Sequence, residues 1–162
     1  MKLWHVAVAV AAVALAGLGY YLISPLFRVV RLDDPEPVSA PAQQMVAEVP
    51  PPIPVESPPP TSAPVVGTAG HPASGTARIV AADGKTYVRY ENFKTINGPD
   101  IYVYLAKDLD ANEFVSLGRV RATEGSVNYE VPAGVDVAAY PYVLTWCKMF
   151  GVLFNYAALS PA

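Results

Sequence analysis

Cys147 is the single cysteine of this 162-residue chain and therefore its single candidate for thiol chemistry. It lies in the apolar run 142–150, where an extended strand would place it on one face with Thr145 and Met149. A reactive thiol needs a lowered pKa and some exposure, whereas the neighbouring cation Lys148 would point to the opposite face. Two interpretations stay open: Cys147 is a redox-active residue, or it is a small buried apolar side chain of a core strand.

His71 is the one histidine outside the apolar amino-terminal segment, and it precedes the first predicted strand of the carboxyl-terminal part. An imidazole can bind a metal or haem iron, or accept a proton. If the first and last strands lie side by side, His71 approaches Cys147, and with Met149 they would form a soft ligand set that suits copper. Haem and copper are therefore the candidate cofactors, with Cys147 and His71 as cofactor-binding residues and Cys147, Met149 and His71 as metal ligands. The alternative is an exposed histidine with no special role.

The composition excludes several classes of protein. The chain carries 11 Lys and Arg against 14 Asp and Glu, a net charge of -3, so no basic face is expected to neutralise the phosphates of a nucleic acid. One cysteine cannot form an internal disulfide or a four-cysteine metal site. The sequence contains no HExxH, CxxC or CxxCH motif and no glycine-rich nucleotide loop, so the familiar hydrolase and cofactor signatures are absent.

Residues 3–27 contain no Asp, Glu, Lys or Arg and predict a membrane-spanning helix. About 20 apolar residues, each rising roughly 1.5 Å, cross a hydrocarbon layer of about 30 Å. Trp4 stands near one end, and Tyr20 and Tyr21 stand near the other, where aromatic rings rest at the two interfaces. The alternative is a cleaved signal peptide, but the apolar run continues beyond the alanine-rich cleavage signal. We therefore assign residues 1–32 to a transmembrane anchor, with residues 3–27 in contact with the lipid bilayer.

Residues 33–69 are rich in proline and predict a disordered stalk. Between Asp33 and Gly75 lie 12 of the 17 prolines, including the triplets 50–52 and 58–60. Such a segment cannot bury enough apolar surface to fold, and an extended polyproline-like chain advances about 3.1 Å per residue. We expect the stalk to hold the following domain tens of ångströms from the bilayer.

Residues 70–162 predict an all-β domain, an antiparallel β-sandwich or a barrel-like fold. Short β-branched and aromatic runs alternate with turn signals at roughly ten-residue spacing. Asp83-Gly84 is a hairpin signal, Glu124-Gly125 separates two later strands, and 136–140 predicts a short helical turn with Asp136 as its cap. The predicted strands are 76–82, 86–93, 101–105, 113–120, 126–131, 142–150 and 152–156.

The predicted domain holds eight tyrosines, and Trp146 lies next to the thiol. One interpretation is an electron-hopping path through closely packed rings. The other is that aromatic residues simply favour the half-buried faces of sheets.

A set of short motifs occurs along the last 90 or so residues. They are His71-Pro72-Ala73-Ser74-Gly75-Thr76, Glu91-Asn92-Phe93, Asn97-Gly98-Pro99-Asp100 with Ile101-Tyr102-Val103-Tyr104-Leu105, Leu117-Gly118, Asn128-Tyr129-Glu130-Val131-Pro132-Ala133-Gly134-Val135-Asp136, Trp146-Cys147-Lys148-Met149-Phe150 and Ala157-Ala158-Leu159. Together these motifs resemble those of the DM-thirteen domain family, which is found beside DOMON domains in extracellular Skeletor-like proteins. The resemblance covers residues 70–159 and implies an extracytoplasmic domain with a role in electron transfer, centred on a shared cysteine that is Cys147 here.

We therefore expect a single-pass membrane protein whose carboxyl-terminal domain lies in the periplasm or at the cell surface. Its expected role is redox or electron transfer centred on Cys147, as a module rather than a turnover enzyme, with an unidentified redox or surface protein as partner. One thiol cannot close an internal disulfide, so thiol cycling would require a partner protein, a small thiol or a metal. The alternative is a non-catalytic module that presents its sandwich loops to another surface protein or a glycan.

Overall fold

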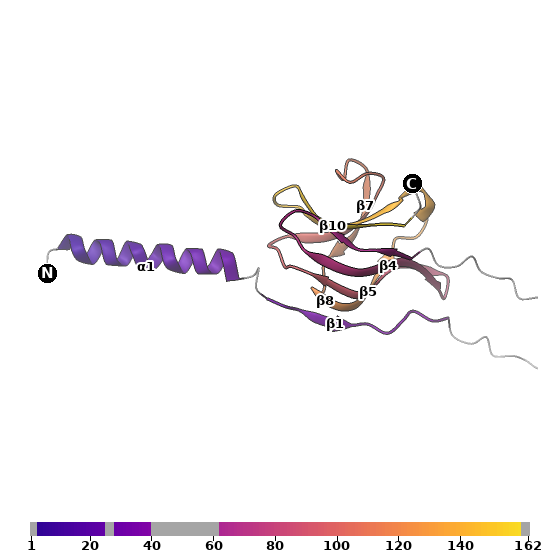
Figure 1. The fold of residues 1–162 in the computed structure, drawn as a ribbon, viewed down its shortest axis with the longest axis horizontal. Coiled ribbons are helices and arrows are strands. Elements are labelled where there is room, and N and C mark those ends of the chain that lie inside the picture. Colours follow the sequence, from indigo (N-terminus) through magenta and orange to yellow (C-terminus); the bar gives the residue numbers. More distant parts are fainter. Residues whose placement is uncertain (1–2, 25–27, 40–61, 160–162) are drawn as a thin grey trace, which may run out of the picture.

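The computed structural model describes residues 3–24, 28–39 and 62–159, and the described strands form two five-stranded sheets that pack face to face (Figure 1). This confirms the all-β sandwich class. The strand order is β1-β8-β5-β4-β2 in the first sheet and β3-β10-β9-β6-β7 in the second. The strands are β1 (Arg31–Asp33), β2 (Ser62–Pro64), β3 (Val66–Gly67), β4 (Ala73–Ala82), β5 (Lys85–Thr95), β6 (Ile101–Ala106), β7 (Phe114–Arg119), β8 (Glu124–Val131), β9 (Tyr142–Cys147) and β10 (Val152–Ala158).

The helix α1 (Leu3–Ile23) precedes the sheets and lies apart from them (Figure 1). Its most apolar stretch is not buried against any other described part of the chain. By length and composition α1 is able to cross a membrane, and a signal sequence near the amino terminus passes the same test. The predicted apolar helix is therefore present, and its role is a candidate membrane span or signal sequence.

The turns follow the local signals of the sequence. Asp83 and Gly84 both have positive φ, 49° and 73°, as the two-residue turn of a tight hairpin requires, and they join β4 to β5. The expected helical turn is the 3₁₀-helix η2 (Val137–Ala139), where the Ala138 amide donates to the Asp136 carboxylate at 3.0 Å. Both sequence predictions are confirmed, because each signal acts within a few residues.

Two irregular positions face each other on β4 and β5. Gly75 has φ of 112°, Asn92 has φ of 48°, and the register between the two strands shifts at Gly75. A Cβ atom at Gly75 would lie 2.7 Å from the carbonyl oxygen of Glu91, closer than real contacts allow. Glycine is therefore required where the two bulged strands approach one another.

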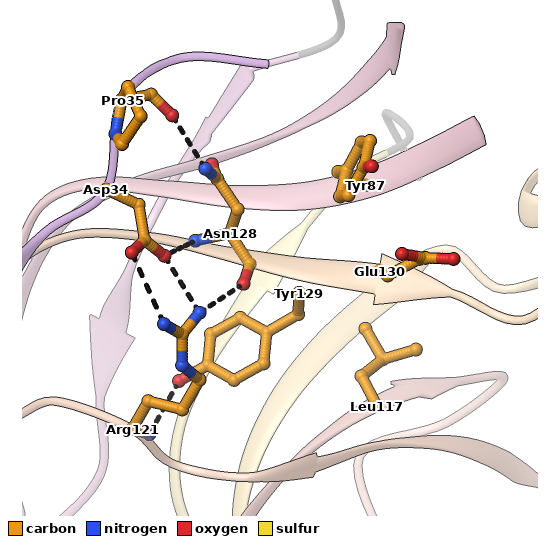
Figure 2. Close-up of a pocket in the computed structure, with 8 residues that line it drawn as sticks. All are labelled: Asp34, Pro35, Tyr87, Leu117, Arg121, Asn128, Tyr129 and Glu130. Atoms are coloured by element: carbon orange, nitrogen blue, oxygen red, sulfur yellow. Dashed lines mark hydrogen bonds and ion pairs between the residues drawn. The ribbon is translucent and has the colours of Figure 1, made fainter. Parts of the chain in front are cut away.

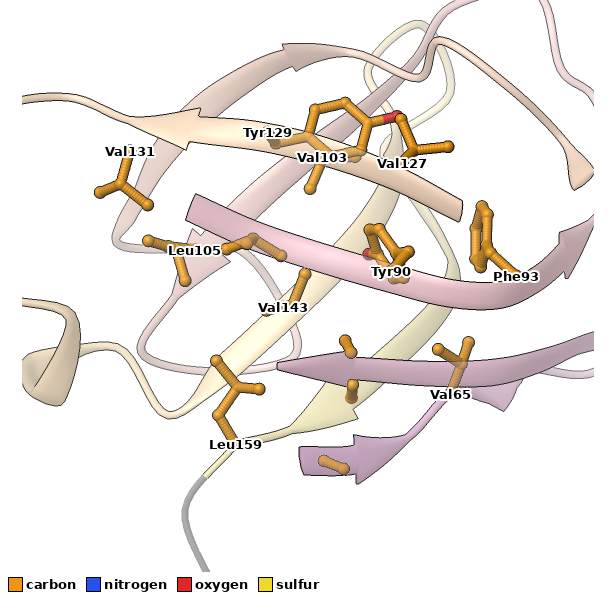
Figure 3. Packing of buried hydrophobic residues seen from close by; sticks show 14 of the residues in the cluster. Val65, Tyr90, Phe93, Val103, Leu105, Val127, Tyr129, Val131, Val143 and Leu159 are labelled. Carbon is orange, nitrogen blue, oxygen red and sulfur yellow. The ribbon is translucent and has the colours of Figure 1, made fainter. Parts of the chain in front are cut away.

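The main core lies between the inner faces of the two sheets (Figure 3). Val88 and Tyr90 from β5 meet Val103, Leu105 and Val143 from β6 and β9, and all five side chains are buried. The alternation of inward and outward residues along β6 and β9 is the period of two that the sequence predicted.

The folded part begins earlier than the sequence predicted. β1 lies across the predicted boundary between anchor and stalk, and β2 and β3 lie within the predicted stalk. β1 pairs in parallel with β8, so that Leu32 lies opposite Gly125, while Ala63 of β2 lies opposite Ala77 of β4. Glu124 and Gly125, expected to form a turn, belong to β8 instead. The rest of the predicted stalk, residues 40–61, lies outside the described residues.

Candidate functional site

Cys147 is the last residue of β9 and lies inside the sandwich with no exposed surface. Its side chain packs in a small apolar cluster with Ile101 and Phe154, and Ile96 and Val120 pack against that cluster from partly exposed positions. The thiol is free. The local pattern that places it there is the alternation along β9, in which Thr145 and Cys147 are fully buried and Trp146 is only partly buried. The predicted orientation of Cys147 is confirmed, and bulky reagents have no access to the sulfur.

His71 is partly buried and contacts Phe154. Its ring stacks on the Phe154 ring with centroids 4.1 Å apart and planes inclined by 29°. Because Phe154 belongs to the cluster that contains Cys147, one aromatic ring links the imidazole to the neighbours of the thiol. We expected His71 to approach Cys147 if the first and last strands lay side by side. In the structure both residues lie near Phe154, and no hydrogen bond between them is among the described contacts.

The hydrogen bonds of Thr68 favour one tautomer of the His71 ring. The Thr68 hydroxyl donates its one proton to the carbonyl oxygens of Leu153 and Phe154, at 2.7 and 3.0 Å. The same oxygen lies 3.2 Å from His71 Nδ1, and because its proton is already committed, it accepts here from an Nδ1–H group. His71 therefore keeps the lone pair of a neutral ring on Nε2, the atom that would bind a metal or accept a proton.

The sequence predicted that Met149 lies on the same strand face as Cys147, and this prediction is wrong. β9 ends at Cys147, and Met149 lies in the turn before β10 with 62% of its surface exposed. The Lys148 amide still donates to the carbonyl oxygen of Asp100 at 2.9 Å, and the chain then turns towards β10, with Gly151 at a φ of 62° in the turn. Among the described residues, no group of three or more His, Cys, Asp or Glu side chains comes together as a metal site. The ligand set of Cys147, Met149 and His71 stays a prediction, in which Cys147 is buried at the end of β9 and Met149 is exposed in the following turn.

An aromatic face covers the outer side of the second sheet. We use this name for Tyr102, Tyr104, Phe114, Tyr142, Trp146 and Tyr156. Tyr104 and Phe114 stack with centroids 4.1 Å apart, and Tyr102 lies opposite Trp146 in the pairing of β6 with β9. Trp146 thus joins the aromatic face while Cys147, the next residue, points into the core.

Three polar side-chain atoms are buried in the described core without a hydrogen-bond partner: the hydroxyls of Tyr90 and Thr145 and the amide oxygen of Asn155. Burial raises the pKa of the Tyr90 phenol well above its usual value, and the Thr145 hydroxyl offsets only part of that rise. Although Thr145 is the polar neighbour of Tyr90, no hydrogen bond of ordinary geometry joins them. Thr145 shares its face of β9 with Cys147, so the core beyond the thiol contains polar groups that the sequence did not reveal.

A model of the family described as Electron transfer DM13 matches residues 66–159, which is more than half of the chain. The chain belongs to the DM13 family. The match confirms the resemblance drawn from the sequence motifs, and it starts at β3 rather than at Gly70. No curated protein and no solved structure matches the chain. The DM13 region contains both His71 and Cys147.

Residues 28–39, which we call the strap, precede the DM13 region and bind along the edge of its first sheet. The Asp34 carboxylate pairs with the Arg121 guanidinium at 2.8 Å and accepts from the backbone N–H of Asn128 at 3.0 Å (Figure 2). The Asn128 side chain donates to the carbonyl oxygen of Pro35 at 2.8 Å. A pocket of about 440 Å³ borders these residues, and its charged groups are already paired, with Glu130 bound to Lys85. The contacts therefore attach the strap to the DM13 region.

Sequence reasoning missed Thr68, Phe154 and the strap. Thr68 and His71 are three residues apart, which was the only local signal of their contact, whereas Phe154 reaches them through a pairing of segments more than 80 residues apart. The strap was missed because the segment that contains Asp34 and Pro35 is polar and rich in proline, which is the composition of a linker.

Proposed function

We propose that this protein is a membrane-anchored electron-transfer module whose DM13 domain lies outside the cytoplasm and uses Cys147 as its redox centre. The observation that carries the proposal is the match of residues 66–159 to a family described by electron transfer. The resemblance of the family to domains of extracellular proteins supports the placement outside the cytoplasm. The 21 residues of α1 span about 32 Å, enough for a hydrocarbon layer of about 30 Å, which supports the anchor.

The burial of Cys147 decides which redox chemistry fits. A mixed disulfide requires a second sulfur to reach this one, and a fully buried thiol prevents that in the closed domain. An electron can cross packed side chains that exclude a bulky reagent. The sealed position therefore supports a one-electron role.

The proposed step moves one electron and one proton. The Cys147 thiol gives an electron to a one-electron acceptor held by a partner protein, a ferric haem or a cupric ion, and the sulfur becomes a thiyl radical. The proton passes to water when the domain opens locally, because His71 contacts the ring of Phe154 and no described hydrogen bond joins its imidazole to the thiol. A later electron and proton restore the thiol. His71 is the residue of this chain placed to bind or face the partner's redox centre.

A stoichiometric oxidation tests this role. We expect the full-length chain in detergent to reduce ferricyanide to ferrocyanide, and Cys147→Ala to do so at least roughly tenfold more slowly. Thr145→Ser is the matched control, because it changes a buried residue on the same face and keeps the thiol. Circular dichroism would verify that all three chains are folded. Equal rates for the wild type and Cys147→Ala would exclude the single-cysteine centre.

The aromatic face supports a second function, that of a non-catalytic interaction module. Phe114 has 44% of its surface exposed, and Tyr102, Tyr142, Trp146 and Tyr156 are only partly buried. Aromatic side chains of this kind are enriched in the centres of protein interfaces. This function would remain if the Cys147→Ala chain transferred electrons as the wild type does.

A further inference from the structure

The start of the strap fixes which end of the sandwich lies next to α1. The Val30 amide donates to the Thr123 hydroxyl at 2.9 Å, and the Thr123 amide donates to the Val30 carbonyl at 2.8 Å. The Asn97 side chain donates to the carbonyl oxygen of Arg28 at 3.3 Å. From Ser24, which follows α1, to Arg28 a chain reaches at most about 14 Å. The end of the sandwich that holds Thr123 and Asn97 must therefore stay close to the end of the helix.

The turn between β9 and β10 lies at this same end. The loop 96–100 contacts both the start of the strap and this turn. The Asn97 side chain donates to the carbonyl oxygen of Arg28, and the carbonyl oxygen of Asp100 accepts from the Lys148 amide. At the tip of the turn, Met149 and Phe150 have 62% and 67% of their surfaces exposed. In Figure 1 this yellow turn projects from the side of the sandwich that faces α1. We call Met149 and Phe150 the apolar tip.

The charges around the apolar tip favour an anionic surface. Lys148 and Arg28 are exposed and lie on either side of the loop 96–100. The acidic groups at this end are already paired, Asp100 with Arg119 and Glu124 with Arg31 and Lys94. Exposed apolar side chains flanked by cations are the pattern of a segment that enters the interface of a bilayer with anionic headgroups.

We propose that the apolar tip inserts into the same bilayer that α1 spans, at the boundary between headgroups and acyl chains. The proposal rests on the anchoring by α1 stated above. The domain would then have two attachments to the membrane, α1 with the strap on one side and the apolar tip on the other. Because Cys147 is two residues before Met149, this orientation holds the end of the sandwich that contains the thiol at the membrane surface rather than tens of ångströms away.

A fluorophore at the tip tests the insertion. Phe150→Cys would be labelled with an NBD maleimide in the full-length chain and reconstituted into phosphatidylcholine–phosphatidylglycerol vesicles with brominated acyl chains. Ala133→Cys is the matched control, because Ala133 is exposed in the turn after β8 at the opposite end of the first sheet. The wild type serves as the blank, since Cys147 has no exposed surface. We expect the bromines to quench the label at position 150 several-fold more than the label at position 133.

The outcomes separate this inference from the anchoring on which it rests. If the labelled chain floats with the vesicles but both positions are equally unquenched, the anchor stands and the insertion is wrong. If the label at position 150 has a blue-shifted emission that bromine does not quench, the tip packs on protein, for instance a second copy, and the insertion is again wrong. If the chain does not float with the vesicles, both the anchor and the insertion are wrong.

Discussion

Cys147 and His71 show how a side chain can be correctly oriented by local pattern and yet placed among neighbours that the sequence does not reveal. The alternation along β9 predicted that Cys147 and Trp146 point to opposite faces, and they do. The contact of His71 with Phe154 depends on hydrogen bonds from Thr68 to a strand more than 80 residues away. Met149 was misplaced because the sequence pattern continued past the residue where β9 ends.

A second group of charged residues allows a prediction of pH dependence. The Glu91 carboxylate accepts from Arg78 at 2.8 Å and from Arg89 at 2.9 Å, and Arg89 is buried. The hydrogen bond from Arg78, followed by that from Arg89, lowers the pKa of Glu91. A carboxyl whose folded pKa is depressed stabilises the fold above its unfolded pKa of about 4.3, and that contribution is lost as the pH falls through the lower folded pKa.

We therefore expect Glu91→Gln to lower the free energy of unfolding by about 2 kcal/mol at neutral pH, because two charge-assisted hydrogen bonds lose their charged acceptor. The difference from the wild type should shrink well below pH 4, where the wild-type carboxyl also becomes neutral. Urea unfolding at the two pH values measures both. Glu113→Gln is the control, since its ion pair with Lys107 is exposed and should contribute little. A difference that is the same at both pH values would show that the charge of Glu91 is not the cause.

At the scale of elements, the strap is the main departure from the sequence prediction. The hairpin at Asp83-Gly84 and the period of two along β6 were predictable, because the turn chemistry and the alternation are local. The strap was not, because its single strand has three residues and is stabilised by partners such as Arg121 and Asn128 that lie about 90 residues further along. The linker-like composition of the strap does not predict which residues it contacts.

Removing the carboxylate of Asp34 should weaken the attachment of the strap. Asp34→Ala leaves the Arg121 guanidinium and the backbone N–H of Asn128 without their shared acceptor. We therefore expect the free energy of unfolding to fall by about 1–2 kcal/mol. Urea unfolding of the full-length chain, followed by Trp146 fluorescence, provides the measurement. Glu130→Ala, which removes an exposed ion pair with Lys85, should change the stability by less than about 1 kcal/mol. A wild-type stability for Asp34→Ala would mean that the strap is not held by this carboxylate.

At the scale of the whole molecule, the strap changes the expected relation between domain and membrane. The sequence predicted that a long stalk separates the two, whereas β1 joins the first sheet within a few residues of α1. The sandwich is therefore attached close to the helix, because β1 follows the helix directly in the described part of the chain and pairs with β8. The fold class and the family could be predicted because seven of the strands and the DM13 motifs lie in one continuous region. The position of the domain could not, since it depends on the pairing of β1 with β8.

The location of the unpaired electron after a one-electron oxidation tests the redox centre most directly. Because the chain has one cysteine, growth on β-deuterated cysteine labels a single site. We predict that the electron paramagnetic resonance spectrum of the oxidised chain narrows with this label, because the proton hyperfine couplings of Cys147 are removed. If the spectrum instead changes with deuterated tyrosine and persists in Cys147→Ala, the electron leaves the aromatic face and the assignment of Cys147 as the centre is contradicted.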